Sequence, residues 1–256
     1  MDSTTLKALK ILETLVRGGR PRGISDLSRE IGLPKSNIHR ALTTLEAAEY
    51  VRRTSESTYT PTLKLWELGL EVMAQVDIRA IAAPHLKALV AETGESVILA
   101  VLDGHDVVYV DKAESGHAIQ AITHVGSRIP AYSVGTGKAM LAFASEALQA
   151  EVAARAVAHT SSTIVGEDAL RNEFAAIRAR GYAINRGEFR DEVSGVAAPI
   201  LDGSGAVIGG VGVWGPDQRF SSKLDVLGVS VLACARRISA EFGAKAASLP
   251  ISRKSK

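Results

Sequence analysis

Near the N-terminus of the chain, apolar residues recur at the spacing of an α-helix. Over residues 6–17 they return every three or four positions behind a Ser/Thr cluster, which predicts a helix. A Gly/Arg/Pro-rich stretch ends it. Residues 24–31 repeat the pattern in a shorter helix, with Ser25 as the expected N-cap and Gly32 at the position of a C-terminal cap. Pro34 is then expected to open a third helix, where its missing N–H costs nothing.

The third predicted helix, residues 34–47, separates apolar from polar side chains. At about 100° per residue, Ala41, Leu42 and Leu45 fall within about 60° of Ile38. The remaining polar positions form an outward face suited to bonding bases and phosphates: Lys35, Ser36, Asn37, His39, Arg40 and Thr43. An ordinary amphipathic surface helix would show the same periodicity.

Residues 51–60, VRRTSESTYT, have strand-like ends around a polar turn and predict a basic hairpin containing Arg52 and Arg53. Three helices followed by a hairpin, with the third helix exposed and polar, is the order of a winged helix-turn-helix domain. The short second helix, the Gly-Leu-Pro turn and the hairpin therefore favour DNA binding over an ordinary surface helix. We expect this domain to cover residues 1–61.

Residues 62–76 form a further apolar-rich stretch whose hydrophobic side chains point in more than one direction. We interpret it as a linker helix that a second subunit helps to bury. The alternative is a helix packed wholly within its own chain.

The pattern changes again over residues 77–256, where helices and strands mix. A helix closed by Gly94 precedes two β-rich runs that meet at Asp103-Gly104, a hairpin signal. Further strands are expected at 117–124, 182–189, 193–201 and 206–215, and further helices at 135–144, 145–157, 167–180 and 221–242. Hairpins beside helices, without a repeating βαβ unit, predict an α+β fold with a mostly antiparallel sheet.

Composition narrows the class of protein. The chain of 256 residues is 46% hydrophobic and 23% charged, which is typical of a soluble globular protein. It has no apolar run long enough for a membrane helix and no signal-peptide pattern at its start, so we expect a cytoplasmic location without membrane contact. Residues 1–60 hold ten Lys/Arg against seven Asp/Glu. This basic excess suggests an N-terminal partner of negative charge.

Three motifs together resemble the IclR family of transcriptional regulators. They are GLPKSNIHRALTTLEAAEYV at 32–51, VGTGKAMLA at 134–142 and RARGYAINRGEFRDEVSGVAAPI at 178–200, and the resemblance extends nearly end to end. It implies a winged helix-turn-helix domain, a linker helix and a GAF-like effector-binding domain. It also implies homodimers, often paired into homotetramers, that bind palindromic operators in double-stranded DNA. The function expected is a transcriptional regulator, in the first place a repressor, controlled by a small organic acid.

The resemblance also implies an effector pocket against the sheet of the second domain. Matching motif positions assigns seven residues to it: Gly135, Thr136, Asn185, Ser194, Gly195, Gly212 and Trp214. Asn185 stands where several members have Asp, and Gly195 where many have Cys. Gly212 and Trp214 stand where acid-binding members often have serines. These departures leave the identity of the effector open.

A physical argument supports an anion near Gly135 and Thr136. Free backbone N–H groups and the positive end of the helix dipole would meet at the start of this helix, beside Lys138. A glycine-rich turn with nothing bound is the alternative. Gly195 and Gly212 are expected to leave room and Trp214 to offer a flat apolar face, which together favour a larger, aromatic acid. Strand alternation could equally turn Trp214 outward.

The sequence does not contain the residue patterns of a phosphate-binding loop, a serine hydrolase, a metal site or a reactive cysteine. VGTGKAM lacks the first Gly and the Ser/Thr of a phosphate-binding loop, and no Gly-x-Ser-x-Gly elbow surrounds Ser133. The histidines are not paired at helical spacing, and Asp103, His105 and Asp106 are interpreted as a solvated turn instead of a metal site. Cys234 lies on an apolar helical stripe and is expected in the core. We therefore expect no cofactor, metal or catalytic residue.

Two other function classes stay open at this point. The second domain could be an enzyme acting on a small acid, although no paired base and nucleophile is found. The first domain could be a winged-helix module that binds protein.

Overall fold

The computed structural model describes residues 3–74, 78–118 and 123–244, and the chain divides into two compact units, residues 1–76 and 77–256. Each unit has its own hydrophobic core. The two units are described separately below.

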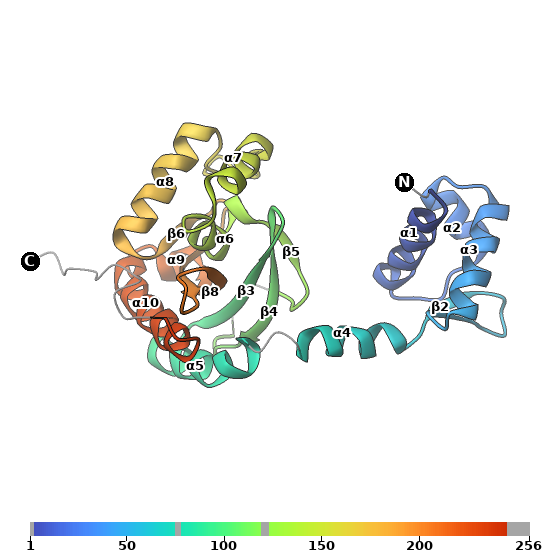
Figure 1. Cartoon of the computed structure of the whole chain (residues 1–256), viewed down its shortest axis with the longest axis horizontal. Helices are drawn as coiled ribbons and strands as arrows, with labels where there is room; N and C mark the ends of the chain where they lie inside the picture. Colours follow the sequence, from blue (N-terminus) through green and yellow to red (C-terminus); the bar gives the residue numbers. More distant parts are fainter. Residues whose placement is uncertain (1–2, 75–77, 119–122, 245–256) are drawn as a thin grey trace, which may run out of the picture. The chain divides into compact units, whose positions relative to one another are not determined.

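Three helices and a two-stranded hairpin form the first unit (Figure 1). The elements are α1 (Ser3–Gly18), α2 (Ile24–Ile31), α3 (Lys35–Ala47), β1 (Val51–Arg53) and β2 (Tyr59–Pro61). The apolar sides of all three helices meet the hairpin in one core, whose fully buried members include Ile11, Leu27, Ile38 and Leu42. The helix-turn-helix domain predicted from periodicity is therefore confirmed.

Two helix starts differ from the sequence-based prediction. Helix α2 begins at Ile24 after Gly23, so Ser25 lies inside the first turn and caps nothing; Gly23 has no side chain to do so. Helix α3 begins at Lys35, and Pro34 precedes it as the N-cap, with its carbonyl accepting from the N–H groups of Asn37 and Ile38. Gly32 ends α2 in the left-handed conformation at φ 75°, as expected for a C-terminal cap.

Helix α4 (Lys64–Ala74) follows the hairpin and carries large exposed apolar side chains. Trp66 is 62% exposed, Leu68 is 38% exposed and Leu63, just before the helix, is 73% exposed. Leu65 packs against the core of the first unit. The side chain of Leu70, which the multi-sided pattern also included, lies outside what the structure describes.

A six-stranded antiparallel sheet organises the second unit, with strand order β5-β4-β3-β8-β7-β6. The strands are β3 (Ser96–Asp103), β4 (Asp106–Ala113), β5 (Arg128–Pro130), β6 (Ala183–Arg186), β7 (Val193–Leu201) and β8 (Val207–Pro216). The predicted α+β class with a mostly antiparallel sheet is confirmed.

Helices cover both faces of this sheet (Figure 1). One face packs against α5 (Ile78–Thr93) and α10 (Leu224–Glu241). The other packs against α6 (Gly135–Leu141), beyond which lie α7 (Glu146–Arg155) and α8 (Glu167–Arg180); the short α9 (Asp217–Phe220) follows β8. The β3–β4 hairpin turns at Gly104-His105, one residue after the start of the predicted Asp103-Gly104 signal: Asp103 ends β3 and pairs with Asp106, and Gly104 has a φ of 62°.

The strand at the edge of the sheet next to β4 was not predicted from the sequence. The strand expected at 117–124 lies partly outside the described residues, at 119–122, and its described ends are not in a strand. The edge position is taken by β5, which pairs with β4 through Arg128, Ile129 and Pro130. Three residues containing a proline carry too little alternation to be recognised as a strand.

Candidate functional site

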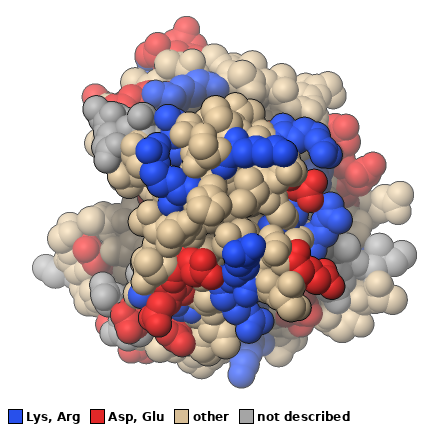
Figure 2. Space-filling model, turned by 90° about the vertical axis from the view of Figure 1, so that its right-hand side faces the viewer, with Lys and Arg blue, Asp and Glu red and all other residues tan. Residues whose placement is uncertain are grey.

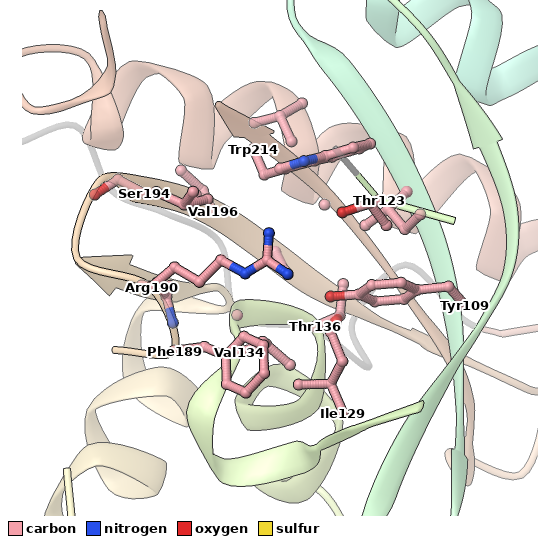
Figure 3. A pocket seen from close by; sticks show the side chains of 18 of the residues that line it. Tyr109, Thr123, Ile129, Val134, Thr136, Phe189, Arg190, Ser194, Val196 and Trp214 are labelled. Atoms are coloured by element: carbon pink, nitrogen blue, oxygen red, sulfur yellow. The ribbon is translucent and has the colours of Figure 1, made fainter. Parts of the chain in front are cut away.

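A cavity of about 150 Å³ lies on the face of the sheet that also packs against α6 (Figure 3). All seven residues assigned to the pocket by motif matching line it: Gly135, Thr136, Asn185, Ser194, Gly195, Gly212 and Trp214. An apolar cavity of this size can hold a benzene ring. Apolar side chains contribute much of its wall, among them Ile129, Val134 and Phe189.

Small residues form the floor, because neighbouring strands and α6 approach each other closely there. Gly195 lies opposite Trp214 in the sheet, and Gly212 lies opposite Ala197. A Cβ on Gly212 would lie 2.8 Å from the Cβ of Ala197, and a Cβ on Gly195 would lie 2.7 Å from the carbonyl oxygen of Val213. These glycines line the cavity and also permit close backbone packing beneath it. Trp214 does line the cavity.

The two neutral hydrogen-bonding residues expected to meet an effector already have protein partners. Asn185 donates from Nδ2 to the carbonyl oxygen of Ser133 at 2.8 Å, and its Oδ1 accepts from the N–H of Glu188 at 3.5 Å. Ser194 donates its hydroxyl to Asp217 Oδ1 at 2.5 Å. Their side chains thus hold the cavity wall together, and each keeps only part of its bonding capacity for a ligand.

Lys138 does not face the cavity, contrary to the expectation that it would stand beside the anion. Its side chain is completely buried, and Nζ donates to Glu188 Oε1 at 2.6 Å, Glu173 Oε1 at 3.2 Å and the carbonyl oxygen of Ile184 at 2.8 Å. The preceding Gly137 permits close packing, since a Cβ there would lie 2.0 Å from the carbonyl oxygen of Ala131. Lys138 therefore ties α6 to β6 and to the loop that follows β6.

Three side chains that the sequence did not indicate reach the cavity: Tyr109, Phe189 and Arg190 (Figure 3). Phe189 and Arg190 come from the loop between β6 and β7, directly after the buried Glu188. Tyr109 comes from β4, where a register shift in its pairing with β3 interrupts simple alternation. The only available signal was the Phe189-Arg190 pair at the end of the strand predicted at 182–189, and it fits an exposed turn equally well.

The cavity is positive in character. Arg190 and His124 are the ionisable nitrogen groups in its lining, and no Asp or Glu lines it among the residues that the structure describes. Burial raises the pKa of Tyr109 to about 12, while a hydrogen bond with Thr136 and the charge of Arg190 act in the opposite direction. The Tyr109 phenol is therefore neutral at ordinary pH and can donate a hydrogen bond.

The predicted DNA-binding side chains lie on the surface of the first unit. Lys35, Ser36, His39, Arg40 and Thr43 are exposed on α3, and Asn37 is half-buried. Arg52 and Arg53 are exposed on β1. Figure 2, which views the molecule from the side where α3 and the hairpin lie in Figure 1, shows Lys and Arg side chains distributed over the facing surface.

Some of these groups are already engaged. The Thr43 hydroxyl donates to the carbonyl oxygen of His39 at 3.0 Å, and Arg53 donates to Ser57 Oγ at 3.0 Å. The first acidic residue along α3 is Glu46, whose carboxylate accepts from the backbone N–H of Arg53. The outer face of α3 is therefore free of carboxylates from Lys35 to Leu45.

Other potential chemistry finds little support in the described part of the chain. No group of three or more His, Cys, Asp or Glu residues there could hold a metal ion. Cys234 is buried, its Sγ lies 3.7 Å from the carbonyl oxygen of His85, and burial raises its pKa to about 11. Within the described residues, no helix combines the length and apolar character that crossing a membrane requires.

Comparisons with known proteins agree with this architecture. Residues 4–55 match the model for the IclR helix-turn-helix domain, and residues 70–240 match the model for the bacterial transcriptional regulator IclR C-terminal domain. The HTH-type transcriptional regulator KdgR of Escherichia coli is 33% identical over 94% of this chain and 93% of its own length. The transcriptional repressor IclR of the same organism is 28% identical over 93% and 89%. The crystal structure of Thermotoga maritima IclR is 30% identical, with a TM-score of 0.76 over 95% of this chain and all of that one.

Proposed function

This chain belongs to the IclR family of bacterial transcriptional regulators, and from that premise we propose that it is a repressor whose α3 binds an operator and whose cavity binds a small organic acid. Members of this family are DNA-binding regulators controlled by effectors, and the relatives matched are not enzymes. Repression is proposed on the relative named a transcriptional repressor. Acting on bacterial DNA would place the protein in the cytoplasm.

The observation that carries the DNA-binding part is the outer face of α3. It presents Lys35, Arg40 and several neutral hydrogen-bonding side chains without an intervening carboxylate. Lysine and arginine contacts to phosphates position such a helix, and side chains in the major groove distinguish base pairs. Arg52 and Arg53 on the adjacent hairpin would contact the backbone or the minor groove.

We also propose that the protein works as a homodimer, which can pair further into a tetramer. Leu63, Trp66 and Leu68 leave a large apolar surface exposed at α4, and a second copy would bury it. On α1, Leu6, Leu9 and Val16 are each about half exposed. A symmetric dimer would present two α3 helices to the half-sites of a palindromic operator.

DNase I footprinting on the DNA flanking the protein's own gene tests the proposal. The wild-type protein should protect a palindromic site, and the double substitution Arg40→Ala with Thr43→Ala should abolish protection at the same concentration. Loss of a bidentate arginine contact to guanine costs about 1–3 kcal/mol. Unchanged protection by the double variant would overturn the assignment of α3.

A further inference from the structure

Three hydrogen-bond donors from different elements meet in the cavity. Figure 3 shows the Arg190 guanidinium projecting between Trp214 and Phe189, with the Tyr109 hydroxyl and Thr136 on the opposite wall. Arg190 belongs to the β6–β7 loop, Tyr109 to β4 and Thr136 to the first turn of α6. The guanidinium points toward the phenol (Figure 3), and its positive charge acts to lower the pKa of Tyr109.

Thr136 gives an independent indication that something binds here. Its side chain is only 3% exposed, and its Oγ1 is one of few buried side-chain atoms in the described structure without a hydrogen-bond partner of good geometry. It lies beside the phenol of Tyr109, which is 7% exposed. Buried hydroxyl groups are nearly always satisfied, and the contact with the Tyr109 phenol leaves the Thr136 hydroxyl without a well-aligned partner, so bonding capacity remains here for a ligand atom.

The charge around these hydroxyl groups selects an anion. Arg190 forms no ion pair within the described residues, and its cationic group stacks 6.0 Å from the ring centre of Phe189. The adjacent Asp191 and Glu192 are exposed and do not line the cavity. One guanidinium with two hydroxyl donors matches one negative charge spread over two oxygens.

We propose that Arg190, Tyr109 and Thr136 bind the carboxylate of the effector, and that the effector is a monocarboxylic acid with a flat apolar body. This assignment rests on the proposed effector function of the cavity. The guanidinium and the two hydroxyl groups donate to the carboxylate oxygens, and the body lies against Phe189 and Trp214. A phosphate would bring two charges and three free oxygens to a cavity in which Arg190 is the permanently cationic side chain of the described lining.

The proposed position of the effector carboxylate therefore differs from the position expected from the sequence. Backbone N–H groups at the start of α6 and Lys138 were expected to supply the positive potential. Lys138 is neutralised by Glu173 and Glu188, and α6 is only seven residues long. Of the predicted anion-binding groups, Thr136 keeps its role, and Arg190 replaces the lysine.

Isothermal titration of the full-length protein with benzoate and with its neutral analogue benzamide tests this proposal. Benzoate should bind the wild type at least tenfold more tightly than benzamide. Arg190→Gln should lose at least tenfold in benzoate affinity while its benzamide affinity stays within twofold. Tyr109→Phe and Thr136→Val should each lose about threefold or more for benzoate. Arg186→Gln, an exposed arginine outside the cavity lining, is the matched control and should bind as the wild type does.

Three outcomes would overturn the proposal: no preference for benzoate, an equal loss of both probes in Arg190→Gln, or wild-type benzoate affinity in that variant. Thermal unfolding of each variant without ligand identifies a folding defect. If Arg190→Gln is unstable, the Tyr109→Phe variant, which removes only one oxygen atom, tests the carboxylate site in its place. Footprinting separates this test from the proposed function. If the protein protects an operator but does not bind benzoate, only the proposed carboxylate site is wrong. If it binds benzoate but protects no operator, only the proposed function as a DNA-binding regulator is wrong.

Discussion

Lys138 shows how a single residue can serve a binding site without touching the ligand. Its ammonium is completely buried and is balanced by Glu188 and Glu173, while Arg180 donates to Glu173 from the other side. Glu188 immediately precedes Phe189 and Arg190, and Lys138 lies in the same helix as Thr136. The Lys138–Glu188 pair therefore fixes the β6–β7 loop to α6, which positions two walls of the cavity relative to each other.

Replacing Lys138 by methionine should destabilise the second unit by about 3–5 kcal/mol, because the substitution leaves the buried Glu188 carboxylate without a counter-charge, whereas Glu173 keeps Arg180. Urea unfolding followed by circular dichroism measures the change. Lys87→Met, at an exposed position on α5, is the control and should change stability by less than about 0.5 kcal/mol. Equal stability of the two variants would show that the buried pair contributes nothing.

Cys234 permits a prediction about alkaline pH. Burial raises its pKa from 9.0 to about 11, so the folded state holds the thiol proton more tightly than the unfolded state. The stabilisation from this group is complete below about pH 9 and is lost as the pH rises through 11, by up to about 2–3 kcal/mol. The free energy of unfolding should fall less steeply between pH 9 and 11 in Cys234→Ala than in the wild type. Parallel curves for the two proteins would contradict the buried, protonated thiol.

At the residue scale, the hydrophobic pattern of the sequence predicted the burial of side chains more successfully than it predicted their contacts. The apolar stripe of α3 and the burial of Cys234 followed from periodicity alone. The partners of Lys138 could not be predicted, because Glu173 and Glu188 lie 35 and 50 residues away along the chain. Arg190 was missed for the same reason: nothing local indicates that its loop folds over a sheet.

At the scale of elements, α3 and the hairpin carry different parts of DNA recognition. Arg40 lies on the exposed face of the helix and Arg52 on the exposed hairpin, and neither forms an ion pair with a described residue. A base contact sets sequence preference, whereas a phosphate contact sets affinity and its dependence on salt.

Arg52→Ala should therefore weaken binding to specific and unrelated DNA alike and should reduce the slope of log K against log salt by about one. Arg40→Ala should mainly reduce the difference in binding affinity between the specific and the unrelated DNA. Fluorescence anisotropy at several salt concentrations measures both quantities. If Arg52→Ala changed only the preference between DNAs, the division of roles between these elements would be wrong.

Strong helical periodicity and glycine signals made most elements predictable. Gly32 and Gly94, which were expected to end α2 and α5, have positive φ values of 75° and 73°. The short strand β5 was missed because its pairing with β4 is a tertiary interaction. The glycines of the cavity floor were located by motif, but their steric role depends on how closely β7, β8 and α6 approach, which only the structure shows.

At the scale of the whole molecule, the exposed apolar residues around α4 predict self-association. The double substitution Leu63→Ser with Trp66→Ser should convert a dimer into a monomer at micromolar concentration, as measured by multi-angle light scattering, because burying Trp66 and Leu63 in both copies drives association. Val157→Ser, which removes another exposed apolar side chain from the second unit, should leave the dimer intact. A monomeric wild type that still protects its operator would contradict the dimer.

We propose that an acid in the cavity of the second unit controls DNA binding by the first unit. By linkage, an effector that changes operator affinity must itself bind with different affinity to the free and DNA-bound protein. The most direct measurement is the anisotropy of a labelled operator fragment, titrated with full-length protein in the presence and absence of saturating benzoate. We predict at least a fivefold change in operator affinity for the wild type and for Arg186→Gln, and no change for Arg190→Gln. An operator affinity that is identical with and without bound benzoate in the wild type would contradict the account.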